Sequence, residues 1–381
     1  MNQVTQRAII AATSRNMATT ADYFGGTIRK RHKKPSYLRT VPPVTPTGGR
    51  FTVTMVPGIG AGPQMMKQLM KVFEAAGAPI DFEVIEDIKA TKNIISSIKR
   101  NGVAIKGHIP ELPDHASNTT LRTLLDLYTY KVHIRSYPNV RSKIDNLDVY
   151  VFRQNIEGEY AMLEHSPKPG IVESLKIITR ETTERFAYWA YGFARKHMRK
   201  KITIIHKANI MKLADGLFLK TIQHIGKEFP DIKTENMIVD NCSMQIVKDP
   251  HAFDVLLTPN LYGNIVISIF CGLIGGHGLI SGENISDDNA VFEVGLRHIA
   301  LQDPVYFNPI AMLNAGVEML LYLKKDAYAN LIAEAVYSTL VEDKCHTPDL
   351  GGEATSSDVV NNVICRMKET LNREPLPSIF L

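Results

Sequence analysis

Short apolar runs alternate with longer amphipathic segments along most of this 381-residue chain. The runs that predict strands are Phe51–Val56, Ile80–Ile85, Val103–Lys106, Leu147–Arg153, Ser174–Thr179, Ile202–His206, Met237–Asp240 and Phe253–Leu257. The segments that predict helices include Pro63–Ala76, Glu181–His197 and Met211–Glu228. Strands and helices in alternation are typical of an α/β architecture, so this is the fold class we predict, with a mostly helical last hundred residues.

The formal charge of +5 comes from the N-terminal segment. Residues 1–50 hold nine Lys or Arg and a single acid, Asp22, so the rest of the chain carries 35 basic and 38 acidic side chains. A basic, Ser/Thr-rich and acid-poor segment is typical of mitochondrial targeting sequences. We therefore predict a transit arm over residues 1–49, a location in the mitochondrial matrix and no nucleic-acid partner. A solvated basic tail or a nucleic-acid arm is the alternative.

The most apolar stretch, Ile265 to Ile280, is interrupted by glycines. It is shorter than the roughly 20 apolar residues that a membrane span needs, so we expect a buried helix and turn and no membrane span. The four cysteines are far apart without a C-x-x-C pair, and all are interpreted as packing residues (Cys242, Cys271, Cys345 and Cys365).

A glycine-rich segment, Pro57 to Pro63, follows a predicted strand and opens a predicted helix. Backbone N–H groups in this position could bind a phosphate. Its glycines follow the pattern G-x-G-x-G, however, which differs from the dinucleotide fingerprint G-x-G-x-x-G. A tight turn explains the segment equally well.

Three motifs identify a family. They read Arg153-Gln154-Asn155-Ile156-Glu157-Gly158-Glu159-Tyr160, His206-Lys207-Ala208-Asn209-Ile210-Met211 and Pro259-Asn260-Leu261-Tyr262-Gly263-Asn264. In this order they resemble the isocitrate and isopropylmalate dehydrogenases, metal-dependent enzymes that oxidise a 2-hydroxy acid and remove its β-carboxylate. The segments 346–352 and 236–241 look most like the gamma-type subunits of the mitochondrial NAD-linked members.

The resemblance implies a two-lobed α/β fold that is not a Rossmann fold. Residues 50–146 and 283–381 would form a large three-layer α/β/α domain. Residues 147–282 would form a smaller α/β domain that carries the dimer interface.

Two expected metal ligands are missing. In catalytic members, the resemblance implies two aspartates four residues apart, a spacing that places both carboxylates on one helix face for Mg²⁺ or Mn²⁺. Here these positions are Asn264 and Ser268, which leave Asp240 as the only family-matched carboxylate. We expect Asn264 and Ser268 to be degenerate ligands, so that any metal site in this chain's own pocket is weak.

The substrate and cofactor positions are also altered. Arg122 and Arg153 match the family's carboxylate-binding arginines, but Val132 replaces a third. The family's nicotinamide-cofactor loop is replaced by the sequence from Val294 to Leu301. Asn308 is the one position at which we expect a cofactor contact, and a weak one.

Other functional positions are kept. Tyr160, Lys207 and Asp240 match the family, in which this lysine and this aspartate complete the active site of the partner across the dimer interface. The resemblance therefore implies a regulatory subunit of an NAD-dependent isocitrate dehydrogenase that lends Lys207 and Asp240 to a catalytic alpha-type subunit. Mg²⁺ or Mn²⁺ and NAD would bind at the partner's site.

Gamma-type subunits use the corresponding cleft as an allosteric site for citrate and ADP. Asn118, Arg122 and Arg153 match their citrate-binding positions, whereas His108 and Ala116 replace an Asn and a Ser. Two other functions stay open on the sequence: an active dehydrogenase with an atypical metal site, and a scaffold or binding protein that has left this chemistry. The substituted metal and cofactor positions oppose the first, and the intact Lys207 and Asp240 oppose the second.

Overall fold

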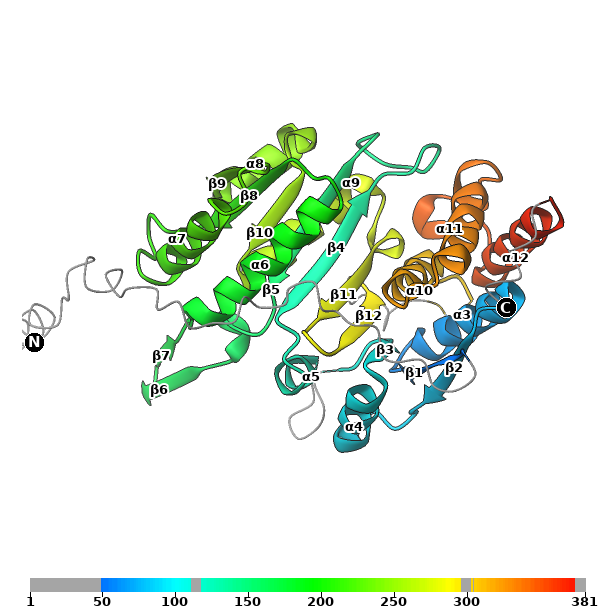
Figure 1. Cartoon of the computed structure of the whole chain (residues 1–381), viewed down its shortest axis with the longest axis horizontal. Helices are drawn as coiled ribbons and strands as arrows, with labels where there is room; N and C mark the ends of the chain where they lie inside the picture. Colours follow the sequence, from blue (N-terminus) through cyan, green and yellow to red (C-terminus); the bar gives the residue numbers. More distant parts are fainter. Residues whose placement is uncertain (1–48, 111–117, 296–302, 304, 374–381) are drawn as a thin grey trace, which may run out of the picture. The chain divides into compact units, whose positions relative to one another are not determined.

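A computed structural model of the chain describes residues 49–110, 118–295, 303 and 305–373. Ten strands form one mixed sheet in the order β2-β1-β3-β12-β11-β4-β5-β10-β8-β9 (Figure 1). Their bounds are β1 Phe51–Val56, β2 Ile80–Val84, β3 Val103–Lys106, β4 Thr129–Arg135, β5 Asp148–Gln154, β8 Lys201–His206, β9 Lys233–Ile238, β10 Val255–Thr258, β11 Ser281–Ile285 and β12 Ala290–Val294. Strands β6 (Glu164–Lys168) and β7 (Ile171–Ser174) form a separate hairpin.

The sheet contains two parallel blocks joined by an antiparallel centre. Strands β2, β1, β3 and β12 pair in parallel, as do β5, β10, β8 and β9. Strands β11 and β4 lie between the blocks, and each pairs antiparallel with both of its neighbours. The central strands thus bring residues 129–135, 148–154 and 281–294 side by side.

Helices cover both faces of the first block. Helices α3 (Gly62–Ala76), α10 (Ile310–Tyr322), α11 (Asp326–Val341) and α12 (Ser356–Arg373) pack with Val53 and Met55 in one apolar cluster. Helices α4 (Thr91–Asn101) and α5 (Asn118–Leu124) pack with Val56 in another. Successive strand side chains point to opposite faces, so a strand covered on both sides is apolar at nearly every position.

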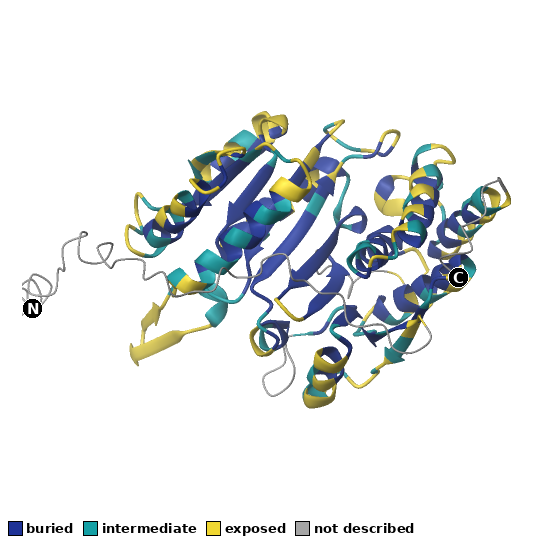
Figure 2. Cartoon of the chain, in the orientation of Figure 1, coloured by how far each residue is buried: buried dark blue, intermediate teal, exposed yellow. Residues whose placement is uncertain are grey.

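The second block is covered in the same way. Helices α6 (Arg180–Lys196) and α7 (Ala214–Gly226) pack on one face, where Trp189 contacts the ring of Phe152 edge-on. Helices α8 (Val239–Lys248) and α9 (Asn260–Ile274) pack on the other. Figure 2 shows the buried strands between these helices and the exposed β6–β7 hairpin.

The predicted α/β class is confirmed, and most expected strands and helices lie within a few residues of the observed ones. The strand expected over residues 174–179 is wrong, because β7 ends at Ser174 and the chain then runs to the N-terminus of α6. Asp240, expected at the end of a strand, lies in the first turn of α8. The two-lobe boundaries stay a prediction, and the predicted transit arm lies outside the described residues except for residue 49.

Two smaller expectations have mixed outcomes. Cys242 and Cys271 are buried, but Cys365 is exposed on α12, so its assignment as a packing residue is wrong. The glycine-rich segment forms a tight turn in which Gly58 has φ +73° and lies so close to the backbone of His108 that a Cβ atom would clash. Among the described residues, no helix is long and apolar enough to cross a membrane.

Candidate functional site

A cavity of about 250 Å³ opens where strands β4, β5 and β12 meet helices α5 and α9. It is lined by Arg122, Tyr130, Arg153, Tyr160, Asn264, Ser268, Glu293, Val294 and Gly295. Five of these are residues that the sequence predicted as site residues: Arg122, Arg153, Tyr160, Asn264 and Ser268. The fold therefore brings together positions up to 146 residues apart in the chain.

Two buried arginines supply the positive charge of this cavity. The guanidinium carbon of Arg153 lies 4.6 Å from the centre of the Tyr130 ring, and that of Arg122 lies 5.9 Å from the same centre. Burial, followed by the neighbouring charge of Arg122, lowers the pKa of Arg153 to about 9. The Arg153 guanidinium group is therefore charged at neutral pH. A carboxylate that enters the cavity would be attracted to Arg153 and to the neighbouring Arg122.

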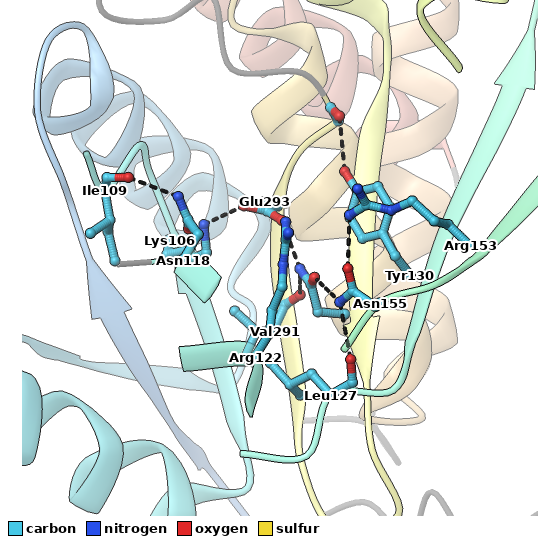
Figure 3. A network of polar contacts seen from close by, with 12 residues as sticks. Lys106, Ile109, Asn118, Arg122, Leu127, Tyr130, Arg153, Asn155, Val291 and Glu293 are labelled. Atoms are coloured by element: carbon cyan, nitrogen blue, oxygen red, sulfur yellow. Dashed lines mark hydrogen bonds and ion pairs between the residues drawn. The ribbon is translucent and has the colours of Figure 1, made fainter. Parts of the chain in front are cut away.

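Glu293 partly balances these charges from β12 (Figure 3). Its carboxylate forms ion pairs with Lys106 and, at 3.6 Å, with Arg122. Asn284 also donates a hydrogen bond to it at 2.7 Å. Burial by itself raises the pKa of Glu293, but the two cations and these hydrogen bonds outweigh it and hold this pKa well below its usual range.

A chain of amides connects Glu293 with Arg153. Asn155 donates to Asn284 at 2.9 Å and accepts a hydrogen bond from the Arg153 guanidinium at 2.8 Å. Of the residues in this network, sequence reasoning missed Tyr130, Glu293 and Asn284. Asn155 was included, because it lies within the first family motif. A sequence signal existed only for Glu293, which directly precedes the segment that the resemblance implies to be a replaced cofactor loop.

The two positions that the sequence predicts to be degenerate metal ligands, Asn264 and Ser268, are engaged in hydrogen bonds. The Asn264 amide accepts a hydrogen bond from Arg153 and donates one to the Tyr160 hydroxyl. Ser268, one turn later in α9, donates its hydroxyl proton to the carbonyl oxygen of Asn264 at 2.8 Å. A guanidinium beside two neutral side chains does not match the oxygen-rich, anionic shell that Mg²⁺ or Mn²⁺ prefers.

The lining of this cavity therefore does not fit a divalent cation. Among the described residues that line it, Glu293 is the only carboxylate, and it is already paired with Lys106 and Arg122. Within the part of the chain that the structure describes, no three His, Cys, Asp or Glu side chains are arranged as metal ligands.

Lys207 and Asp240 lie together outside this cavity. Lys207 follows β8, Asp240 lies in the first turn of α8, and Lys207 Nζ is 2.6 Å from Asp240 Oδ1. The hydrogen bond from Lys207 lowers the pKa of Asp240. Both side chains are accessible, with 27% of the Lys207 side chain and 66% of the Asp240 side chain exposed.

Three other positions from the sequence analysis, Asn118, Asn308 and Val132, are not among the residues that line the cavity. Asn118, at the start of α5, is buried and donates its amide to the carbonyl oxygen of Ile109 at 2.7 Å. Asn308 is buried and donates to Asp349 at 3.0 Å. Val132, the position where the family resemblance implies a third arginine, is fully buried in the apolar cluster beneath α9. Ala116 and the segment 296–301 lie outside the described residues.

Comparison with known proteins places these features in context. Residues 52–363 match the family profile described as isocitrate/isopropylmalate dehydrogenase. The chain is 44% identical over 338 residues to the human mitochondrial isocitrate dehydrogenase [NAD] subunit gamma, covering 86% of both chains. It is 45% identical over 333 residues to the mitochondrial isocitrate dehydrogenase [NAD] subunit 1 of Saccharomyces cerevisiae, covering 84% of this chain and 92% of that one.

A solved structure is also similar. The isocitrate dehydrogenase of Methylococcus capsulatus superposes with a TM-score of 0.79 and 34% identity, covering 84% of this chain and 99% of that chain. The expected family fold and the resemblance to gamma-type subunits are thereby confirmed. Because the relatives are named as mitochondrial, the predicted mitochondrial location is confirmed as well.

Proposed function

The chain belongs to the isocitrate/isopropylmalate dehydrogenase family, and from this premise we propose that it is a non-catalytic, regulatory subunit of an NAD-dependent isocitrate dehydrogenase. The assembled enzyme would oxidise and decarboxylate isocitrate to 2-oxoglutarate. This chain would lend two side chains to the active site of a catalytic alpha-type subunit.

One observation carries the proposal. Asn264 and Ser268, where catalytic members have the paired aspartates, are neutral, and Asn264 is hydrogen-bonded to Arg153 and Tyr160. Lys207 and Asp240, by contrast, form an accessible pair outside that cavity. The chain thus lacks the paired carboxylates that a metal site in its own cavity would need. Its Lys207 and Asp240 side chains, in contrast, are accessible to a neighbouring subunit.

The proposed roles of the two lent residues follow from their chemistry. The Lys207 ammonium group would hold and transfer a proton at the substrate hydroxyl, and the Asp240 carboxylate would supply an anionic oxygen to the partner's metal shell. A divalent cation bound there would stabilise the negative charge that develops during decarboxylation. NAD would bind the partner subunit.

The chain's own cavity would bind a regulatory anion. Arg122 and Arg153 are buried guanidinium groups, and Asn118 lies one helical turn before Arg122. A small tricarboxylate such as citrate matches two guanidinium groups, each of which can bind a carboxylate in a bidentate manner. ADP is the second effector that the family resemblance implies.

Co-expression with a catalytic alpha-type subunit tests the proposal. The wild-type pair should form an active hetero-oligomer, and Lys207→Met or Asp240→Asn in this chain should each lower kcat by on the order of 10²-fold, the usual scale for a lost proton-transfer group. Lys212→Met, an exposed lysine in the same loop, is the matched control.

Two outcomes would contradict the proposal. Full activity of the hetero-oligomer that carries Lys207→Met and Asp240→Asn together would leave a scaffold or purely allosteric role. Reduction of NAD by the isolated chain with isocitrate and Mn²⁺, at the roughly 1–10³ per second of ordinary enzymes, would instead identify an active dehydrogenase with an atypical metal site.

A further inference from the structure

Three charged side chains form an ion network that the proposed chemistry does not use. Lys176, in the segment between β7 and α6, has its ammonium nitrogen 2.8 Å from Asp215 Oδ1 and 3.1 Å from Glu159 Oε1. The Asp215 side chain is fully buried, and only 12% of the Lys176 side chain is exposed. Charges this deeply buried are stable only while paired, so the partners of Lys176 are tied to it.

One end of this network holds Lys207. The second carboxylate oxygen of Asp215 accepts a hydrogen bond from the backbone N–H of Lys207 at 2.7 Å. Asp215 lies in the first turn of α7, and Lys207 lies in the loop that leads into that helix. The position of the Lys207 backbone therefore depends on Asp215, and Asp215 is in turn held by its ion pair with Lys176.

The other end reaches the arginine-lined cavity. Glu159 directly precedes Tyr160 in the short helix η1 (Glu159–Ala161). The Tyr160 hydroxyl accepts a hydrogen bond from Asn264, which in turn accepts one from Arg153. The Lys176 ammonium nitrogen also lies 4.5 Å from the centre of the Tyr262 ring on α9, the helix that carries Asn264.

The backbone reinforces this connection. Gly158 N–H donates to the carbonyl oxygen of Ile177 at 2.9 Å, which fixes η1 against the segment that carries Lys176. The Asn260 amide donates to the carbonyl oxygen of Glu157 at 2.8 Å, which ties the chain just before η1 to the start of α9. A displacement of η1 would therefore be transmitted to Lys176.

We propose that Lys176 is a positioning residue that couples occupancy of the arginine-lined cavity to the placement of Lys207, the residue lent to the partner under the proposed function. A polycarboxylate bound by Arg153 competes with Asn264 for that guanidinium group. The hydrogen bond of Asn264 to Tyr160 then changes, η1 moves, and the Glu159–Lys176–Asp215 network carries the movement to Lys207.

Kinetics of the hetero-oligomer with a catalytic subunit, with and without citrate, test this coupling. Glu159→Gln removes the charge that links the network to η1 but keeps the pair of Lys176 with Asp215. It should retain turnover without citrate and lose the change in kcat that citrate produces. The dissociation constant for citrate, measured by calorimetry, should stay within about twofold of wild type.

Variants of Lys176 test the centre of the network. Lys176→Met should lower kcat by roughly 10- to 10²-fold with little change in KM, because small displacements of a catalytic group have effects of this size. Lys176→Arg keeps the charge and should restore most of the lost kcat. Lys227→Met, an exposed lysine at the end of α7, should behave as wild type and serves as the control.

The outcomes separate this inference from the proposed function. A citrate response that survives Glu159→Gln and Lys176→Met, or a wild-type hetero-oligomer whose kcat is unaffected by citrate, overturns the coupling. If Lys207→Met leaves kcat intact, the proposed function itself fails. If Lys207→Met removes activity while the Lys176 and Glu159 variants behave as wild type, only the coupling is wrong.

Discussion

The ammonium group of Lys207 lies 2.6 Å from the carboxylate of Asp240, and both side chains reach solvent. Exposed ion pairs contribute little to folding stability, because water screens the charges and two flexible side chains must be ordered. The pair is therefore poorly explained as a folding element. It is well placed to exchange its internal contact for one with a second chain.

The isolated chain should consequently tolerate loss of this pair. Lys207→Met and Asp240→Asn should leave its Tm, measured by scanning calorimetry, essentially unchanged. Lys106→Met provides the contrast, because it removes one cation from the buried Glu293 and should lower Tm clearly. A drop in Tm for the Lys207 variant as large as for the Lys106 variant would show that the Lys207–Asp240 pair is structural.

Binding of citrate to the isolated chain should depend on both buried arginines. Arg122→Ala and Arg153→Ala should each weaken binding by about 1.5–3 kcal/mol, which is the usual contribution of a charge-assisted hydrogen bond and corresponds to roughly 10- to 150-fold. Titration calorimetry measures this directly. Arg195→Ala removes an arginine that pairs with Asp231 at the surface and is the control. Unchanged affinity in both cavity variants would place the citrate site elsewhere.

Glu293 should make folding sensitive to acid. Its pKa in the folded chain lies well below its usual range, whereas the unfolded chain should titrate near about 4.3. The stabilisation by its charged form is therefore complete above about pH 5 and is lost as the pH falls through and below the unfolded pKa. The folded chain should become less stable on acidification for this reason.

Glu293→Gln should remove this dependence. At pH 7 the variant should be less stable by about 3–5 kcal/mol, because Lys106 and Arg122 lose a buried counter-charge. Between pH 5 and the acid limit its stability should fall less steeply than that of the wild type. Urea unfolding at a series of pH values measures both effects, and parallel curves for the two proteins would contradict the assignment.

Sequence patterns predicted the outer strands better than the central ones. Strand β1 is an apolar run, and its observed bounds equal those expected. Strand β11 reads Ser-Gly-Glu-Asn-Ile, and no apolar pattern marks it, although every residue in it is buried. Glu283 pairs with Lys131 of β4, and Asn284 pairs with Asn155, which directly follows β5. Local sequence does not reveal either partner.

In the candidate site, too, local sequence predicted some residues and missed those that distant strands bring together. Motif spacing identified Arg153, Tyr160 and Asn264, and the fold places them around one cavity. It did not identify Tyr130 or Glu293, because their proximity to the arginines depends on the order of strands β12, β11 and β4 in the sheet. Long-range pairing of this kind is visible only in three dimensions.

Restoring the missing carboxylates should restore metal binding in part. Positions 264 and 268 are one turn apart on α9, so Asn264→Asp together with Ser268→Asp would place two carboxylates on one helix face. The double variant of the isolated chain should bind Mn²⁺ at least about tenfold more tightly than wild type in a titration followed by electron paramagnetic resonance.

Asn264→Asp alone should gain less, because Arg153 already donates to this side chain and would compete with the ion as a charge partner. Asn264→Ser with Ser268→Asn keeps both positions neutral and is the control. The double variant should still not reduce NAD with isocitrate, because the family resemblance implies that the sequence from Val294 to Leu301 replaces the cofactor loop. If its affinity for Mn²⁺ equals that of the control, loss of the two carboxylates does not explain why this cavity is unsuited to a metal.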